Sequence, residues 1–322
     1  MIEEIPDFLV PYTKTQCLQR LLKIDMNCGV NYTSLPFFRT VSSYSRYEHS
    51  LKTALLAYRF TKDPRQALAC LFHDCSTPAF SHTVDFLYHD ALKQEYTEGK
   101  TEMFIRQDTE VMELLNKDGI EVNEVSDYHI YPLCDNSSPQ LSCDRLEYTL
   151  SNALHYGFCN QKNIDDIVED IEISQNEYGE EELFFHSAKK ANEFCELSLK
   201  CGTIYASCMD RYAMQRLSEI LREAMSSEVL QESDLYMNEP YVIGKLLQSS
   251  LREAWLNYTK LSSIQLFSSE VEGSLQLRTK KRYINPGVTG KGRSTDLNDS
   301  LRKKVQIYVS DKQNEWIKGD TI

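Results

Sequence analysis

Most of the chain shows the spacing of apolar and polar residues that is typical of α-helices. Over residues 50–58 apolar side chains recur every three or four positions, so that they form one stripe along a helix. Pro64 opens a second helix through the apolar run 67–72, because proline is tolerated in the first helical turn. The same pattern predicts further helices at 110–116, 143–156, 186–200, 207–226 and 240–261.

One internal segment departs from this pattern. Residues 171–173 and 183–185 alternate apolar and polar side chains, and the turn-forming stretch 176–179 separates them. Strict alternation is typical of a strand with one exposed face, since successive side chains of a strand point to opposite sides. We therefore expect a small, acidic β-hairpin within residues 168–187.

The character of the chain changes again after about residue 265. Short runs rich in Val, Leu and Tyr predict strands at 305–309 and 315–317. The Gly-rich basic stretch 285–293 lacks the Gly-Lys-Ser/Thr ending of a phosphate-binding P-loop, so we interpret it as a flexible loop. The expected fold is mainly α. A helical core over residues 1–265 includes the hairpin, and a short α+β appendage follows over residues 266–322.

Composition restricts the classes of protein. The 322 residues are 41% hydrophobic, which supports a sizeable core. Ten cysteines without a Cys-x-x-Cys pair, and no signal-like amino terminus, predict reduced thiols in a cytoplasmic protein. No apolar stretch approaches about 18 residues, so no membrane span is expected. The net charge of −13 argues against a nucleic-acid partner, whereas a small anionic substrate stays possible where a metal and a few Arg residues dominate locally.

The candidate chemistry centres on His73 and Asp74, which end the apolar run of the second helix. His49 lies upstream and Asp144 downstream, each in a segment of its own. Imidazole nitrogen and carboxylate oxygen together suit iron, manganese, nickel, zinc or magnesium better than a thiolate-loving ion. Taken alone, the pair could equally be a buried histidine that is hydrogen-bonded to a helix-capping Asp. A shared metal site requires three separate segments to converge, and we therefore expect it between packed helices.

The motifs around these residues occur in a characteristic order, at residues 19–21, 45–51, 72–74, 78–85 and 144–148. In order and spacing they resemble the HD-domain metal-dependent phosphohydrolases, and within them the deoxynucleoside triphosphate triphosphohydrolase branch. The resemblance covers roughly the first 225 residues. It implies an HD-domain helical core and one divalent metal ion, held by His49, His73, Asp74 and Asp144.

The resemblance also implies roles for two further side chains, and the chemistry of phosphate hydrolysis at a metal ion suggests roles for two more. Arg46 and Arg145 would contact a substrate phosphate, to which a planar guanidinium group is well suited. His82, oriented by Asp85 three residues later on a new helix, would transfer protons. Simpler alternatives stay open. Arg46 could pair with Glu48 at the surface, and Asp85 could have a purely structural role in which it stabilises the helix through a contact with His82.

The chain also departs from the triphosphohydrolase pattern. Thr77 stands where that branch has an intermediate histidine, and Met26 stands where it has a glutamine that reads the sugar. Residues 92–107 contain no histidine, although Glu95, Glu98 or Glu102 could supply a carboxylate there. Residues 200–211 match poorly with the branch's basic, His-rich helix. These departures argue against triphosphohydrolase activity.

The sequence therefore predicts a divalent-metal-dependent phosphohydrolase that acts on a phosphate ester or anhydride, with a nucleotide as the expected small phosphorylated substrate. Two alternatives remain. One is a non-catalytic, metal-containing nucleotide sensor, which Thr77 suggests. The other is an interaction module on the HD scaffold, in which the basic segment 278–304 contacts an acidic partner or nucleic acid. The sequence leaves homo-oligomer formation open.

Overall fold

The structure is a computed structural model that describes residues 4–88, 92 and 99–321. Helices dominate it, so the mainly α expectation is confirmed. The longer helices are α3 (Arg46–Thr61), α4 (Pro64–Phe72), α7 (Thr109–Asp118), α8 (Cys143–His155), α9 (Gln161–Glu169), α10 (Ala188–Tyr205), α11 (Cys208–Ser226), α13 (Glu239–Leu247), α14 (Arg252–Thr259) and α16 (Asp299–Ser310). The shorter helices are α1 (Gln16–Gln19), α2 (Pro36–Thr40), α5 (Thr83–Leu87), α6 (Thr101–Gln107), α12 (Glu232–Leu235) and α15 (Ser294–Leu297). Among the described residues, no helix combines the length and apolarity needed to cross a membrane.

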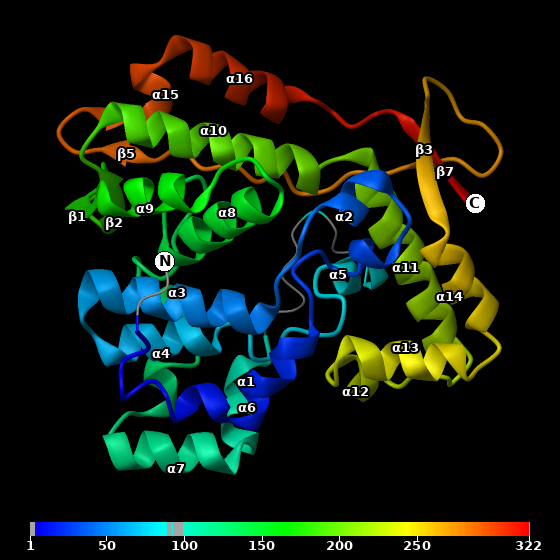
Figure 1. The fold of residues 1–322 in the computed structure, drawn as a ribbon, viewed down its shortest axis with the longest axis horizontal. Coiled ribbons are helices and arrows are strands. Elements are labelled where there is room, and N and C mark those ends of the chain that lie inside the picture. The colour runs from blue at the N-terminus through cyan, green and yellow to red at the C-terminus, as the bar shows by residue number, and fades with distance from the viewer. Residues whose placement is uncertain (1–3, 89–91, 93–98, 322) are drawn as a thin grey trace.

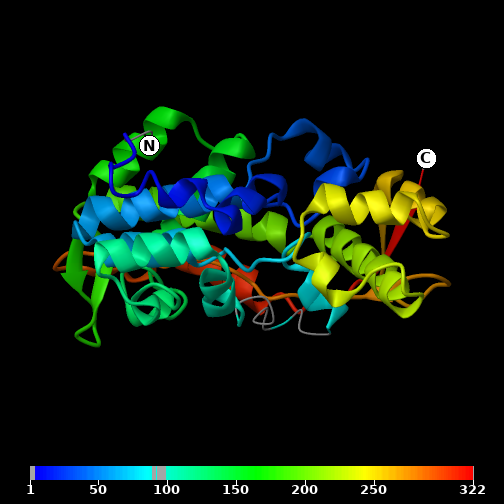
Figure 2. The same cartoon turned by 90° about the horizontal axis from the view of Figure 1, so that it is seen from below.

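Two hydrophobic cores lie along the long axis of the molecule. The first is formed mainly by α3, α4, α8 and α10, whose buried faces meet around residues such as Leu68, Leu146 and Phe194. The second lies where α5, α11, α13 and α14 pack, with Leu217 and Trp255 at its centre. Figure 2 shows the same two groups of helices from below. The site described next lies between these cores.

Two small sheets complete the fold. The strands are β1 (Ile171–Gln175), β2 (Glu181–Phe185), β3 (Leu261–Phe267), β4 (Leu275–Gln276), β5 (Gly287–Val288), β6 (Gly292–Arg293) and β7 (Trp316–Thr321). The predicted hairpin is confirmed, because β1 pairs with β2 in antiparallel register. β5 continues that sheet parallel to β2, and β6 follows it. In the second sheet, β7 lies between β3 and β4.

Three expectations are wrong in detail. The helix expected at 240–261 is two helices, because Ser249 accepts a hydrogen bond from the Leu251 backbone and donates one to the Leu246 carbonyl, which ends α13. The strand expected at 305–309 is part of α16 (Figure 1). The Gly-rich stretch 285–293 is not simply a loop, since it contains β5 and β6. The strand expected at 315–317 overlaps β7.

The segment after residue 265 is in contact with both halves of the molecule. Its β7 pairs with β3, its β5 pairs with β2, and α15 and α16 pack against α10. The stretch between β4 and β5, residues 277–286, crosses from one sheet to the other along α10 (orange in Figure 1). The boundary between 265 and 266 stays a prediction. We refer to residues 277–286 as the crossing segment.

Candidate metal centre

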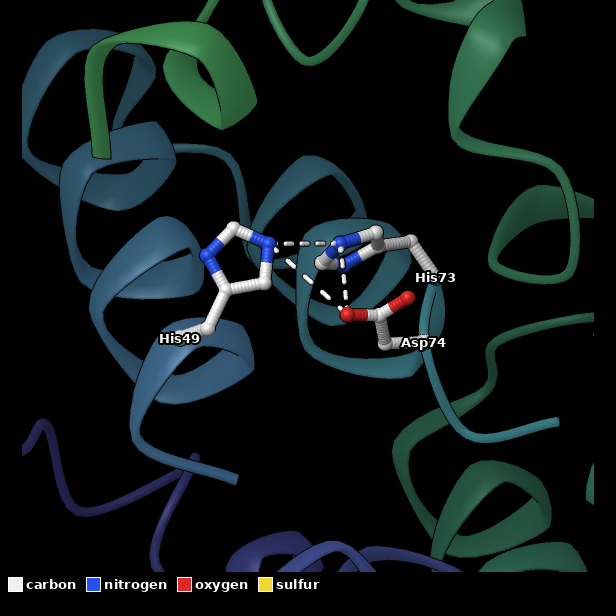
Figure 3. Close-up of side chains that lie close together, drawn as sticks. All are labelled: His49, His73 and Asp74. Atoms are coloured by element: carbon white, nitrogen blue, oxygen red, sulfur yellow. Dashed lines mark hydrogen bonds and ion pairs between the residues drawn. The ribbon is translucent and has the colours of Figure 1, made fainter. Parts of the chain in front are cut away.

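The ends of three helices bring the four predicted ligands together. His49 lies in the first turns of α3, His73 is the C-cap of α4 with Asp74 directly after it, and Asp144 lies in the first turn of α8. The Nε2 atoms of His49 and His73 are 3.1 Å apart, and Asp74 Oδ2 lies 3.8 Å and 3.6 Å from them (Figure 3). Asp144 Oδ1 is 3.0 Å from His49 Nε2 and 3.6 Å from His73 Nε2.

These distances match a shared cation. Metal–ligand bonds of about 2.0–2.2 Å place neighbouring ligand atoms about 3.0–3.6 Å apart. The ligand atoms of His49, His73 and Asp74 all lie within 4.8 Å of one another. The four side chains are little exposed, and their two carboxylates match the charge of a divalent ion.

Hydrogen bonds fix both imidazoles in the tautomer that ligation needs. His73 Nδ1 lies 2.6 Å from the Cys70 carbonyl oxygen, which can only accept, so this nitrogen carries the proton. His49 Nδ1 lies 2.5 Å from Glu147 Oε2, a buried carboxylate that also accepts a bond from Ser151. In the neutral rings, both Nε2 lone pairs therefore point at the same place. Two facing lone pairs are unfavourable unless a cation lies between them or one of the two rings takes up a proton.

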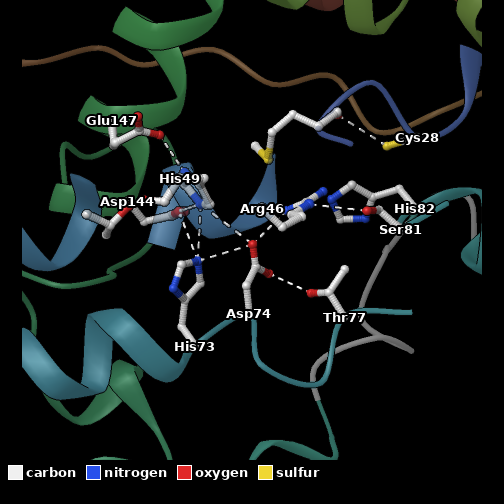
Figure 4. A network of polar contacts seen from close by, with 12 residues as sticks. Cys28, Arg46, His49, His73, Asp74, Thr77, Ser81, His82, Asp144 and Glu147 are labelled. Atoms are coloured by element: carbon white, nitrogen blue, oxygen red, sulfur yellow. Dashed lines mark hydrogen bonds and ion pairs between the residues drawn. The ribbon is translucent and has the colours of Figure 1, made fainter. Parts of the chain in front are cut away.

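Glu147 is a member of the candidate centre that the sequence interpretation missed. It follows Asp144 by three positions on α8, so both carboxylates lie on the same face of the helix, and Glu147 is fully buried (Figure 4). An acidic residue on the apolar face of a predicted helix was the available signal. Its contact with His49 is the carboxylate–histidine pairing that orients metal ligands in many proteins.

Arg46 and Thr77 orient Asp74. The Arg46 Nη1 atom donates to Asp74 Oδ2 over 2.9 Å, its Nε donates to Ser81 Oγ over 3.1 Å, and Thr77 Oγ1 donates to Asp74 Oδ1 over 2.7 Å (Figure 4). Arg46 is buried, so the surface pair with Glu48 is wrong. Glu48 instead completes a capping box with Ser45 at the start of α3. The hydroxyl of Thr77 thus holds a carboxylate in place.

The electrostatic environment keeps both acidic ligands ionised. Burial alone would raise the pKa of Asp74, but Arg46 and the two histidines hold it well below its usual range. Burial likewise opposes ionisation of Asp144, whose pKa is nevertheless lowered to about 2 by its hydrogen bond with His49. Against the effect of burial, Glu147 and Asp144 raise the pKa of His49 to about 10. Without a bound cation, His49 is therefore protonated at neutral pH.

Cation binding should consequently release a proton from His49. A ligating imidazole must be neutral, so below pH 10 the proton has to leave, and the apparent affinity should rise about tenfold per pH unit between pH 6 and pH 8. Calorimetric titration with Mn²⁺ in buffers of different ionisation enthalpy measures this release. We expect about one proton per ion and less in Glu147→Gln, where the main charge that raises this pKa is gone. Binding that releases no proton and does not vary with pH would contradict this assignment.

His82 and Asp85 form a pair at the other side of the site. His82 precedes α5, and its Nδ1 lies 2.9 Å from Oδ2 of the fully buried Asp85. The second carboxylate oxygen of Asp85 has no hydrogen-bond partner among the described residues. Burial lowers the pKa of His82, Asp85 opposes this effect, and Arg282 and Arg46 add to it. His82 is thus neutral at pH 7, with Nε2 as its basic atom.

Arg145 lies in the cavity wall with most of its donors engaged. It donates to the Asn136 side chain, to the carbonyl oxygens of Asn136 and Gln140, and pairs with Asp135 at 3.1 Å. The segment 92–107 lacks a histidine and offers three candidate carboxylates, of which Glu102 lines the cavity. Glu95 and Glu98 lie outside the described residues.

A cavity of about 770 Å³ surrounds the candidate centre. Its wall includes all four candidate ligands together with Arg46, His82 and Arg145. Tyr148, Asn152, Tyr156 and Tyr205 form an aromatic and polar side. Met26 and Thr77 also line the cavity. The volume is that of a typical small-molecule site.

Comparison with known proteins gives two similar chains. The protein is 25% identical over 281 residues to the uncharacterized protein YdhJ of Bacillus subtilis, and the match covers 85% of this chain and 84% of that one. It is 30% identical over 113 residues to the metal-dependent phosphohydrolase cns2 of Cordyceps militaris. This second match spans about a third of each chain, 35% here and 32% there. No protein-family model matches.

Proposed function

We propose that the protein is a divalent-metal-dependent phosphohydrolase of the HD superfamily that cleaves a phosphate ester or anhydride of a nucleotide. The observation that carries this proposal is the convergence of His49, His73 and Asp74 within 4.8 Å, with Asp144 beside both histidines. The partial likeness to a metal-dependent phosphohydrolase supports it. One bound divalent ion would supply Lewis-acid activation of water and charge stabilisation at phosphorus.

The side chains around the centre suit phosphate hydrolysis. Arg46 lies against Asp74 and can also contact a phosphate oxygen, because its guanidinium group has five donors. Neutral His82 can take a proton from the attacking water at Nε2, while Asp85 stabilises the resulting imidazolium. The same nitrogen can then return the proton to the leaving oxygen. The pair retains proton-transfer chemistry although Thr77 replaces a histidine, and this favours an enzyme over a sensor.

The nucleotide part of the proposal is supported by the opposite wall of the cavity. Tyr148, Tyr156 and Tyr205 line it with Asn152, whose amide donates to the Tyr205 hydroxyl over 2.7 Å. Aromatic faces accommodate a base by stacking, and polar groups beside them can pair with its edge. If the base binds on this side of the cavity, the phosphate of the same nucleotide would lie near Arg46 and the candidate ligands.

A phosphate-release screen tests the proposal. Purified protein loaded with Mn²⁺ is incubated with nucleoside mono- and triphosphates and with non-nucleotide esters, and chelated protein serves as the control. We expect release from at least one nucleotide and none after chelation. Full metal occupancy without release from any compound, combined with saturable nucleotide binding, would favour the sensor instead.

Two departures from the triphosphohydrolase pattern give a prediction on substrate choice. Met26 presents a thioether to the cavity and Thr77 is bound to Asp74, so neither can hydrogen-bond the sugar or donate a proton as an amide or imidazole would. We expect little or no tripolyphosphate release from deoxynucleoside triphosphates. Affinities for a ribonucleotide and its deoxy form should agree within about threefold, because Met26 replaces the glutamine that reads the sugar in that branch. Fast, deoxy-selective tripolyphosphate release, followed by ion chromatography, would contradict both expectations.

A further inference from the structure

The basic stretch that begins at Arg278 contributes to the wall of the cavity. Lys280 and Arg282, both in the crossing segment, line the same cavity as the candidate metal ligands. They follow the ligand Asp144 by more than 130 residues in the sequence and reach the site because the crossing segment runs along α10 (Figure 1).

From Lys280 to Arg282 the crossing segment presents its side chains alternately to two sides. Thr279, Lys280 and Arg282 face the cavity. Lys281 points the other way, where its Nζ atom donates to the Tyr308 carbonyl and pairs with Asp311 at 3.2 Å. Alternation of this kind is expected of extended backbone. The alternation therefore directs both Lys280 and Arg282 toward the cavity.

Contacts along its whole length hold the crossing segment in place. The Thr279 amide donates to the Gln313 side chain over 2.9 Å, and the Ile284 amide donates to Ser198 Oγ over 2.9 Å. Near Arg282 the backbone lies directly against α10, since a Cβ atom on Gly202 would come within 2.3 Å of the Arg282 carbonyl oxygen. The two cations are thus carried on a fixed backbone, as an anion site requires.

Several cations of the basic stretch pair with acidic neighbours away from the candidate ligands. Arg293 pairs with Glu177 and Glu182, Lys304 pairs with Glu196 at 2.6 Å, and Arg302 pairs with Asp299. Lys280 and Arg282 differ from these residues in position, because both line the cavity.

We propose that Lys280 and Arg282 form a second anion-binding subsite, which takes a phosphate of the substrate other than the one held at the metal ligands. The inference rests on the proposed function and deepens it, because it narrows the substrate class to nucleotides with two phosphates, such as nucleoside diphosphates. Arg282 lines the cavity together with His82 and Tyr148, and its charge influences the pKa of both side chains. Arg46 and the candidate ligands would hold the phosphate under attack, and the crossing segment would hold its neighbour.

Calorimetric binding of two nucleotides tests the subsite. Adenosine 5′-diphosphate and adenosine 5′-monophosphate are titrated into Mn²⁺-loaded, full-length protein at constant free Mn²⁺. We expect the unaltered protein to bind the diphosphate at least about tenfold more tightly, and this ratio to fall below about threefold in both Arg282→Gln and Lys280→Gln, which each lose a charge-assisted contact. Arg282→Lys should recover part of it.

Arg278→Gln is the matched control. It removes the same charge from the same stretch, but Arg278 donates to Asn314 at the surface, so the ratio should stay as in the unaltered protein. The subsite is overturned if the unaltered protein binds both nucleotides equally, if Arg282→Gln and Lys280→Gln keep the ratio, or if Arg278→Gln lowers it equally. Phosphate release is measured separately. If the protein hydrolyses nucleotides but Arg282→Gln and Lys280→Gln keep the affinity ratio, only the subsite is contradicted. If both variants lower the ratio but the protein releases no phosphate, only the hydrolase function is contradicted.

Discussion

Replacing Asp74 with Asn should abolish hydrolysis and sharply lower the metal content while the helical fold persists. The change removes one of the two ligand charges, and it leaves Arg46 buried beside a neutral amide. We expect at least about a thousandfold loss of turnover, as is reasonable when a reaction loses its Lewis acid. Metal is measured by elemental mass spectrometry, and helicity by circular dichroism.

Asp118→Asn provides the control for this change. Asp118 is the last residue of α7 and accepts a hydrogen bond from Tyr12 over 2.8 Å, and neither residue lines the cavity. Its replacement should leave both metal content and turnover as they are. If Asp74→Asn, His73→Ala and His49→Ala all keep full metal occupancy, the assigned ligand set is wrong. Loss of helicity in Asp74→Asn would instead show that the carboxylate is needed for folding.

Replacing His82 with Ala should slow the chemical step by about 10²–10⁴-fold, the usual contribution of a general acid or base. Metal content should survive, because His82 contacts none of the four candidate ligands in the hydrogen bonds and ion pairs found among the described residues. Asp85→Asn should cost less, since it disturbs the orientation of the imidazole without removing it. Single-turnover kinetics at saturating substrate separates this loss from one of binding.

His186→Ala is the matched histidine control. Its ring is half exposed and pairs with Glu172 at the hairpin, so turnover should not change. Turnover that is insensitive to His82→Ala would remove His82 from the mechanism and direct attention to Glu102, which also lines the cavity. A similar loss in both histidine variants would point to a general effect of the substitutions.

Local rules predicted most helices, and they failed where long-range packing decides. Residues 305–309 alternate Val, Gln, Ile, Tyr and Val, which reads as a strand. They are helical for two reasons. Asn298 caps α16, because its side-chain oxygen accepts a hydrogen bond from the Leu301 amide. Leu301 and Val305, one helical turn apart, are both buried against Cys195 and Leu199. A pattern of five residues could not reveal either partner.

The candidate ligands could be identified because their spacing and order are themselves a signal. The groups that orient them carry weaker signals: Glu147 is one acidic residue on a helix, and Thr77 appeared only as a departure from a pattern. Lys280 and Arg282 could not be assigned at all. Their place in the cavity depends on how the crossing segment runs along α10, and local sequence holds no information on that path.

Anomalous X-ray scattering from crystals grown with Mn²⁺ tests the central claim most directly. The candidate centre predicts one strong peak within about 2.0–2.3 Å of His49 Nε2, His73 Nε2, Asp74 Oδ2 and Asp144 Oδ1, the distance expected for nitrogen and oxygen ligands. The peak should disappear in crystals of Asp74→Asn. A fully occupied peak elsewhere in the molecule, or no peak between these four atoms at saturating Mn²⁺, would contradict the account.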